Sequence, residues 1–320
     1  MWVQLDILLW FQSIRNPLLD SFFWTVTTIA ETPSLVIATM VVYWCLDKKF
    51  GQKLMFCMVG NLMANSFIKN IFRVKRPIGS RGLTSLKTET ATGYSFPSGH
   101  TQMSTTFWTG IATRFNKKSI YTISVVMAIL VGISRMYLGV HWPTDVLFGW
   151  ILGLVFTVAL GIVFDYVDKN KKYWLLFILP VILIIVDLVS KNYRSLSMIA
   201  VFLGFAIGYT VEDKYVKFDT YLVSQEKRSI KNIYSKNKYG KKNNRVLLSI
   251  GRLAIGITAV LIVYLGVDYA VGQIGYLLCS GSSKVNSNII GMAGGFIKYL
   301  SVVFFATAGA PAIFKLARLD

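Results

Sequence analysis

Apolar runs long enough to cross a lipid bilayer recur along this whole chain of 320 residues. A helix that spans the hydrocarbon core needs about 20 mostly apolar residues. Only 15% of the residues are charged, whereas about 25% are charged in an average soluble domain. Because backbone polar groups inside a bilayer must be paired within the protein, we expect an all-α polytopic bundle of transmembrane helices.

The hydrophobic pattern predicts nine spans that follow an interfacial N-terminal helix at residues 1–17. That first helix is expected to make apolar contacts through Trp2, Leu5, Leu8, Leu9 and Phe11. The first span contains Glu31 and Pro33, so a bend or break is expected there. The spans are expected at 18–45, 52–72, 99–114, 119–138, 144–165, 173–190, 196–211, 247–276 and 289–316.

The basic residues predict how the bundle is oriented. The formal net charge is +19, and Lys and Arg gather in loops 46–53, 114–118, 166–172 and 212–246 and in the C-terminal tail. In a nine-span chain these segments share one side, which the positive-inside rule assigns to the cytoplasm. The N-terminus is then outside and the C-terminus inside. Because such cations serve topology and contact anionic lipid headgroups, the charge does not indicate a nucleic-acid partner.

One basic segment, residues 69–87, is expected on the opposite, outer side. An anionic substrate would explain cations in that position. For four of them, snorkelling of the side chain to the membrane interface remains an open alternative. These four are Arg73, Lys75, Arg81 and Lys87.

Three short motifs stand at the outer ends of predicted spans, so alternating span direction brings them to one membrane face. They run from Lys69 to Pro77, from Pro97 to His100, and from Ser134 to Asp145. The first and third supply Lys69, Arg76 and Arg135. Guanidinium groups bind phosphate oxygens in a bidentate manner and lysine adds a compact charge. Charges this close to a bilayer usually mark function.

The Pro-Ser-Gly-His motif is expected to open a helix. Ser98 and Gly99 would leave backbone N–H groups free at the helix N-terminus, which is an anion-binding arrangement. The only two histidines of the chain, His100 and His141, lie in these motifs. Imidazole titrates near neutrality, so one can attack while the other donates a proton. Asp145 follows His141 by four residues, so in a helical turn its carboxylate could orient the imidazole.

The sequence KxxxxxxRP, then PSGH, then SRxxxxxHxxxD resembles the type 2 phosphatidic acid phosphatase superfamily, a family of membrane lipid phosphate phosphatases. The resemblance covers residues 18–165 most strongly and says little about residues 173–320. It implies that His141 is a nucleophile forming a phosphohistidine, that Asp145 orients it, and that His100 protonates the leaving oxygen. It also implies that the phosphoryl oxygens are held by Lys69, Arg76, Ser98, Gly99 and Arg135.

The same resemblance implies no cofactor and no metal, and the motifs contain no carboxylate cluster that would suggest one. The chain is then divided into a catalytic phosphatase core at 18–168 and an accessory transmembrane region at 169–320 with its basic loop at 212–246. Three cysteines without CxxC spacing indicate neither a zinc site nor a disulfide framework. We expect an integral protein of a bacterial plasma membrane, with its site on the extracytoplasmic face.

Several functions stay open at this point. We favour hydrolysis of a lipid phosphate or polyprenyl diphosphate, because the motifs lie close to the bilayer surface. A lipid phosphotransferase and a phosphatase for a sugar phosphate such as glucose-6-phosphate are the alternatives. A non-catalytic transporter would use intramembrane charges. On a simpler interpretation, the residues that could carry such charges lie at span ends or serve packing, except Glu31, which could pair with a motif cation. The candidates are Glu31, Asp187, Arg252 and Asp268. The sequence does not indicate an oligomeric state.

Overall fold

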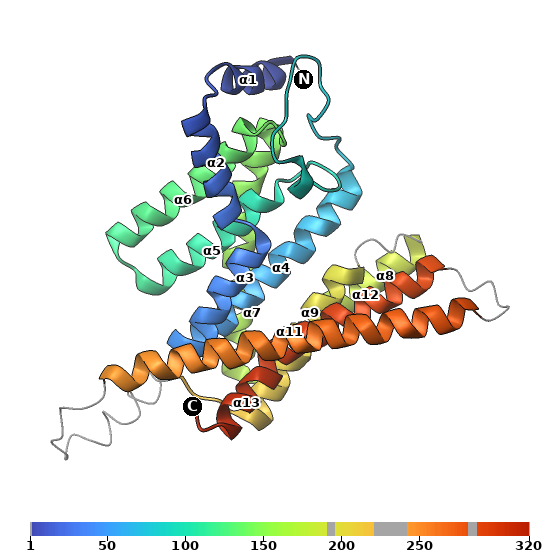
Figure 1. Ribbon diagram of the computed structural model, residues 1–320. Helices are drawn as coiled ribbons and strands as arrows, with labels where there is room; N and C mark the ends of the chain where they lie inside the picture. The colour runs from blue at the N-terminus through green and yellow to red at the C-terminus, as the bar shows by residue number, and fades with distance from the viewer. Residues whose placement is uncertain (1, 191–195, 221–241, 281–286, 320) are drawn as a thin grey trace. The chain divides into compact units, whose positions relative to one another are not determined.

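The computed structural model describes residues 2–190, 196–220, 242–280 and 287–319 (Figure 1). All regular elements in these ranges are helical. In chain order they are α1 (Trp2–Ser13), α2 (Pro17–Ile29), α3 (Thr32–Val41), η1 (Val42–Leu46), α4 (Lys48–Phe72), η2 (Thr88–Thr90), α5 (Gly99–Phe115), α6 (Lys118–Tyr137), α7 (Pro143–Asn170), α8 (Leu175–Ser190), α9 (Leu196–Val211), η4 (Glu212–Val216), α11 (Lys242–Ser280), α12 (Ser287–Phe304), η5 (Phe305–Gly309) and α13 (Ala310–Leu316).

Each predicted span coincides with a helix or a run of helices, but fewer than nine meet the requirements for crossing a membrane. Five described helices are long and apolar enough: Lys118–Tyr137, Pro143–Asn170, Leu196–Val216, Val246–Leu277 and Ile290–Leu316. The pair Pro17–Ile29 and Thr32–Leu46 makes a sixth candidate, bent by 53°. This bend confirms the break expected at Glu31 and Pro33. The remaining helices are short, as α5 is, or rich in polar residues, as α4 is.

The chain divides into two compact units. Unit 1 comprises residues 1–38 and 54–164, and unit 2 comprises residues 39–53 and 165–320. All three sequence motifs lie in unit 1. The expected division of function at residue 168 remains a prediction.

Two glycines let α5 and α7 approach closely in unit 1. A Cβ atom at Gly149 would stand 2.9 Å from Cβ of Thr101, and one at Gly153 would stand 2.8 Å from the backbone oxygen of Gln102. Small residues four apart on a membrane helix allow such close packing. The approach sets the first turn of α5, which carries His100, against the start of α7, which follows His141.

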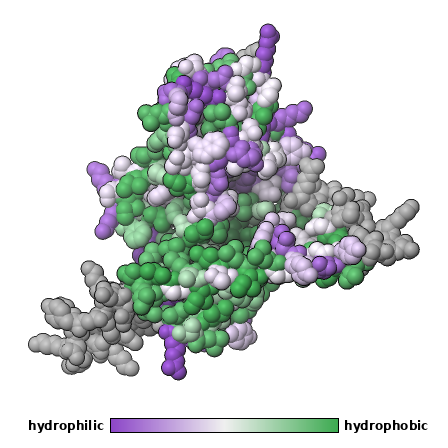
Figure 2. All heavy atoms as spheres, viewed as in Figure 1, coloured by the Kyte–Doolittle hydropathy of each residue, from purple (hydrophilic) through white to green (hydrophobic). Residues whose placement is uncertain are grey.

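Helix α1 lies across the same end of unit 1 as the 73–98 loop (Figure 1). Its expected apolar contacts are partly wrong, because Leu8 is fully buried inside the protein with Leu83 and Trp142. Leu5 and Leu9 pack against this cluster, and Phe11 packs near Tyr137. The exposed apolar residues of α1 are instead Val3, Ile7 and Trp10. A three- to four-residue spacing places them on one face, opposite the packed one. In unit 1, hydrophilic side chains gather at the end that bears α1 (Figure 2).

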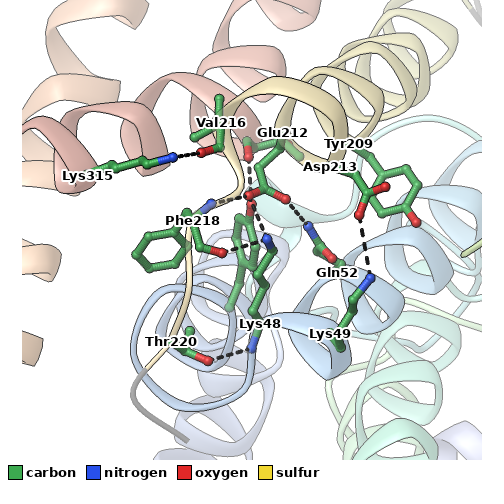
Figure 3. Close-up of polar contacts among 12 residues, drawn as sticks. Lys48, Lys49, Gln52, Tyr209, Glu212, Asp213, Val216, Phe218, Thr220 and Lys315 are labelled. Carbon is green, nitrogen blue, oxygen red and sulfur yellow. Dashed lines mark hydrogen bonds and ion pairs between the residues drawn. The ribbon is translucent and has the colours of Figure 1, made fainter. Parts of the chain in front are cut away.

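Unit 2 contains a buried ionic network around Glu212 (Figure 3). Its carboxylate accepts from Lys48 Nζ at 2.7 Å, from Gln52 Nε2 at 2.7 Å and from the Phe218 N–H at 2.9 Å. Lys48 Nζ also donates to the Phe218 oxygen at 2.6 Å. Beside it, Asp213 accepts from Lys171 and from Tyr173. The network ties the start of α4 to the η4 turn that ends α9.

The π-helical turns η1 and η5 also meet in unit 2. Tyr43 and Trp44 of η1 donate to the backbone oxygens of Thr307 and Ala306 in η5, at 2.6 and 3.2 Å. A π turn leaves backbone carbonyls without regular helical partners, and here aromatic donors satisfy them. Arg252, buried in α11, donates to the Trp44 oxygen at 2.8 Å, and Asp268 pairs with Lys298. Arg252 and Asp268 therefore each have a partner nearby in unit 2.

Candidate active site

His141 and Arg76 come together although 64 residues separate them. Nη1 of Arg76 lies 2.9 Å from Nε2 of His141, and the imidazole is 1% exposed. A guanidinium can only donate, so Nε2 is the acceptor and the proton of the neutral ring is on Nδ1. Burial, followed by the nearby charges of Arg76 and Lys69, lowers the pKa of His141 well below its ordinary value. The ring is therefore neutral near pH 7, with the Nε2 lone pair directed to the cations.

Asp145 lies on the other side of the same ring. Its Oδ2 is 3.3 Å from Nδ1 of His141 and accepts the backbone N–H of Trp142 at 2.8 Å. Ser95 donates a short hydrogen bond to the same oxygen, and its Oγ lies 3.3 Å from Nδ1. The carboxylate is thereby fixed against the nitrogen that carries the proton, as the spacing of His141 and Asp145 predicts. Ser95 was not identified from the sequence, since a lone serine two residues before a proline carries no distinctive signal.

Backbone oxygens of the loop that follows α4, together with the Val140 oxygen, hold the two cations of the first motif. Lys69, in the last turn of α4, donates to the Tyr94 oxygen at 2.6 Å. Arg76 donates to the oxygens of Gly93, Thr92 and Val140 at 3.0, 2.7 and 3.1 Å. Burial lowers the pKa of Arg76 to about 10, so the guanidinium stays charged near neutrality. The loop thus fixes the cations before any ligand arrives.

Arg135 and His100 each present buried nitrogen atoms that lack hydrogen-bond partners among the described residues. Arg135 is fully buried, and only its Nη1 is bonded, to Thr27 Oγ1 at 2.7 Å. Its Nε and Nη2, and Nε2 of His100, have no hydrogen-bond partner among the described residues. A buried polar group without a partner is costly, so three such atoms in one site indicate a polar ligand. The charges of Arg135, Arg76 and Lys69 all act on the His100 ring.

The structure places Ser98 differently from the expectation. Its backbone N–H is not free but donates to the backbone oxygen of Asp145 at 2.9 Å, because the start of α7 packs against this turn. Its Oγ caps α5 by accepting from Thr101 N at 3.5 Å. The N–H groups of Gly99 and His100, in the first turn of α5, have no intrahelical acceptor. The anion-binding end of this helix therefore begins one residue later than the sequence suggested.

A buried polar network supports the same turn from behind. Gln102 donates to Asn61 Oδ1 at 2.9 Å, and Asn65 donates to Gln102 Oε1 at 2.9 Å and to the Pro97 oxygen at 3.3 Å. Asn61, Asn65 and Lys69 recur every four residues along α4, so they share a face. That four-residue spacing of polar side chains along α4 is the signal by which the sequence could have revealed them.

Glu31 pairs with a different cation from those of the motifs. Its carboxylate lies 2.6 Å from Nζ of Lys87, which also donates to Thr28 Oγ1. The Lys87 side chain is 5% exposed, so the snorkelling alternative is wrong for this lysine. Among the described residues, no group of three His, Cys, Asp or Glu side chains is placed to hold a metal.

Comparison with known proteins identifies both halves of the chain. Residues 50–172 match the family described as the PAP2 superfamily. Residues 196–320 match the family described as the PAP2 superfamily phosphatase, transmembrane extension. All three sequence motifs lie inside the first match.

Three similar proteins illustrate the relationship. The undecaprenyl-diphosphatase of Sulfolobus acidocaldarius is 31% identical over 119 residues, covering 37% of this chain and 56% of that protein. Phosphatidylglycerophosphatase B of Bacillus subtilis is 43% identical over 90 residues, covering 25% and 42%. The crystal structure of Aquifex aeolicus LpxE aligns with 49% of this chain and 94% of its own, at 26% identity and a TM-score of 0.45.

This chain spans about half the length of the two curated relatives. Its helices long enough to cross a bilayer make it an integral membrane protein. The two family matches together account for more than half of its residues. The chain therefore belongs to the PAP2 superfamily, with a PAP2 domain followed by the transmembrane extension found in phosphatases of that superfamily.

Proposed function

We propose that this protein is a membrane phosphatase that hydrolyses a lipid phosphate or a polyprenyl diphosphate through a phosphohistidine on His141. The observation that carries the proposal is the contact between Arg76 and Nε2 of His141, beside the unpartnered donors of Arg135 and His100. A neutral nucleophile, three cations and a second imidazole are what metal-free phosphoryl transfer requires.

In the first step, Nε2 of His141 attacks the phosphorus and the bond to the leaving oxygen breaks. Asp145 stabilises the imidazolium that forms, through Nδ1. His100 gives a proton to the leaving oxygen. Charge on the equatorial oxygens is neutralised by Lys69, Arg76, Arg135 and the N–H group of Gly99, with Ser98 capping the helix that presents it.

In the second step, water attacks the phosphohistidine and His100 accepts its proton, so that orthophosphate leaves and the enzyme is regenerated. The cations take the part that Mg²⁺ plays in other phosphoryl-transfer enzymes. We therefore propose that turnover needs no metal.

Two observations favour a lipid substrate. The relatives named above act on undecaprenyl diphosphate and, by name, on phosphatidylglycerophosphate. A third relative, from Porphyromonas gingivalis, is a lipid A 4′-phosphatase, 28% identical over 168 residues. The site also adjoins α1, whose exposed Val3 and Trp10 suit a bilayer surface. A water-soluble sugar phosphate remains the alternative substrate.

The proposed topology has nine spans, with the N-terminus outside and the C-terminus in the cytoplasm. Helices α4, α5 and α8 fall short of the length or hydropathy that a span needs by itself, and in this topology they would complete the nine spans. This arrangement puts the site on the extracytoplasmic face of a bacterial plasma membrane and the basic loop 212–246 in the cytoplasm. The structure describes residues 212–220 and 242–246 of that loop, and residues 221–241 lie outside the described ranges.

A phosphotransferase is the second candidate, since a phosphohistidine can pass its phosphoryl group to an alcohol instead of water. Product analysis with added lipid alcohols separates the two. A transporter finds less support, because Glu31, Arg252 and Asp268 all have local partners.

The test uses purified protein in detergent with EDTA. Orthophosphate release is measured from undecaprenyl diphosphate, phosphatidic acid, phosphatidylglycerophosphate, sphingosine-1-phosphate and glucose-6-phosphate. We expect release from lipids in the wild type and none in His141→Ala. Release that persists in His141→Ala, or that requires an added divalent cation, would contradict the mechanism. A clear preference for glucose-6-phosphate would contradict the substrate class.

A further inference from the structure

A buried lysine outside the three motifs, Lys87, is bonded to the same turn of α2 as Arg135. Nζ of Lys87 is held by Glu31 at 2.6 Å and by Thr28, and it lies 4.9 Å from the centre of the Trp24 ring. Its backbone has a φ of 53°, which is uncommon for a residue other than glycine. The buried ammonium group is therefore held by Trp24 and Thr28 of α2 and by Glu31, which follows that helix.

Lys87 and Arg135 are attached to the same turn of α2. Thr27 accepts from Arg135 and the next residue, Thr28, accepts from Lys87. Both cations are therefore bonded to consecutive residues of one helix. The charge of Lys87 acts on the His100 ring, and that of Glu31 acts on Arg135. Lys87 is thus an edge of the cradle that Arg135 and His100 form.

The ammonium has a donor left for a ligand. Lysine has three N–H donors, and the described residues take two of them, through Glu31 and Thr28. A buried ion pair adds little net stability over apolar packing. An apolar side chain could fasten the loop as well, so fastening does not require a charged residue here. Binding a second phosphate group of the substrate does require one. The position next to His100 is on the side of the leaving group, since His100 is the group assigned to protonate it.

We propose that Lys87, positioned by Glu31, binds the inner phosphate of a lipid diphosphate and makes the site selective for diphosphates over monophosphates. This inference rests on the proposed phosphatase function. His141 attacks the terminal phosphorus, and the bond from that phosphorus to the bridging oxygen breaks. The electron pair stays on the bridging oxygen, so the leaving group is a lipid monophosphate. Lys87 stabilises the negative charge that this group gains. When the substrate is a monophosphate ester, the leaving group is the lipid alcohol, which His100 protonates. This substrate has no second phosphate to contact Lys87.

The test compares two substrates that share one tail, farnesyl diphosphate and farnesyl monophosphate, in detergent micelles. The measured quantity is the ratio of their kcat/KM values. In Lys87→Met we expect the ratio to fall about 10-fold or more, because a charge-assisted hydrogen bond to phosphate is lost. Lys87→Arg should retain most of the preference. Glu31→Gln, which leaves Lys87 less firmly positioned, should lower the ratio by a smaller factor.

Arg81→Gln is the matched control, because Arg81 is an exposed cation of the same loop, and its ratio should equal that of the wild type. An equal loss for both substrates in Lys87→Met would show that the lysine only fastens the loop, and an unchanged ratio would show no role in selectivity. Either result overturns the inference while leaving the phosphatase function intact. Failure of the wild type to release phosphate from either substrate would overturn the proposed function itself, and the inference with it.

If Lys87→Met proves unstable, inhibition of the wild type by inorganic anions tests for the second phosphate subsite instead. Inorganic pyrophosphate should inhibit farnesyl monophosphate hydrolysis by the wild type more strongly than orthophosphate does. Equal inhibition by the two anions would contradict a second phosphate subsite.

Discussion

Nη1 of Arg76 lies 2.9 Å from Nε2 of His141, while Oδ2 of Asp145 lies 3.3 Å from Nδ1 of the same ring. A donor on one nitrogen and a carboxylate on the other select a single tautomer. In the proposed mechanism the ring would then attack through Nε2 without any proton rearrangement. Four consequences can be measured.

The first concerns the pH dependence of catalysis. Attack requires neutral His141, so the acid limb of the kcat/KM profile reports its pKa. Burial and the cations lower that pKa, so the wild type should keep its activity as the pH falls to about 6.5. Arg76→Gln removes the largest of the charge effects, so the limb should move to higher pH. Its activity should also fall about 10²–10³-fold. A limb that stays in place or moves to lower pH would contradict the assignment.

The second concerns Ser95, which we regard as a positioning residue for Asp145 and His141. Ser95→Ala leaves a buried carboxylate oxygen with one donor fewer, so kcat should fall about 10-fold or more, with little change in KM. The exposed Thr88 of the same loop supplies the control variant, Thr88→Ala, which should behave as the wild type. A change confined to KM would indicate instead that Ser95 acts on substrate binding.

The third concerns the attachment of α1 to the loop. Gln12 pairs with the backbone of Gly82 and Thr84 at 2.8 and 2.7 Å, and Arg15 donates to the Thr84 oxygen at 2.6 Å. Removing both side chains in Gln12→Ala/Arg15→Met should free the loop, so trypsin should cleave after the exposed Arg81 several-fold faster. Asp6→Asn, on an exposed position of α1, should not alter the cleavage rate. Equal rates in all variants would show that α1 does not hold the loop.

The fourth concerns the buried network of unit 2. Glu212→Ala leaves Lys48 buried without its carboxylate, which typically costs about 3–5 kcal/mol of the free energy of unfolding. The exposed pair of Lys53 and Asp165, at 2.6 Å, offers a matched comparison. Asp165→Ala should cost under about 1 kcal/mol, because water screens an exposed pair. Thermal unfolding in detergent measures both, and similar losses would contradict the importance of burial.

The sequence by itself predicted the helical membrane fold and the positions of the helices. Apolar run length and the punctuation by Pro, Gly and charged loops are local properties, and each predicted span has its helix in the structure. The break at Glu31 and Pro33 was predictable for the same reason. The count of nine spans was not confirmed, because α4 and α5 carry polar residues that serve packing within unit 1.

The motif residues were also visible in the sequence, because phosphate chemistry needs particular residue types at fixed spacings. Their contacts were not. The sequence predicted a free backbone N–H at Ser98, whereas in the structure this group donates to the backbone oxygen of Asp145 because α7 packs against it. It placed Leu8 at the membrane, whereas burial against Leu83 turns the opposite face of α1 outward.

Only the tertiary structure identified Ser95 and Lys87 as neighbours of the site. Each contacts a partner far along the chain, Asp145 and Glu31 respectively. No local pattern encodes such pairs, since they depend on which helix faces close when the bundle packs. Residue chemistry therefore determined what kind of site this chain builds, and long-range packing decided which additional side chains hold and extend it.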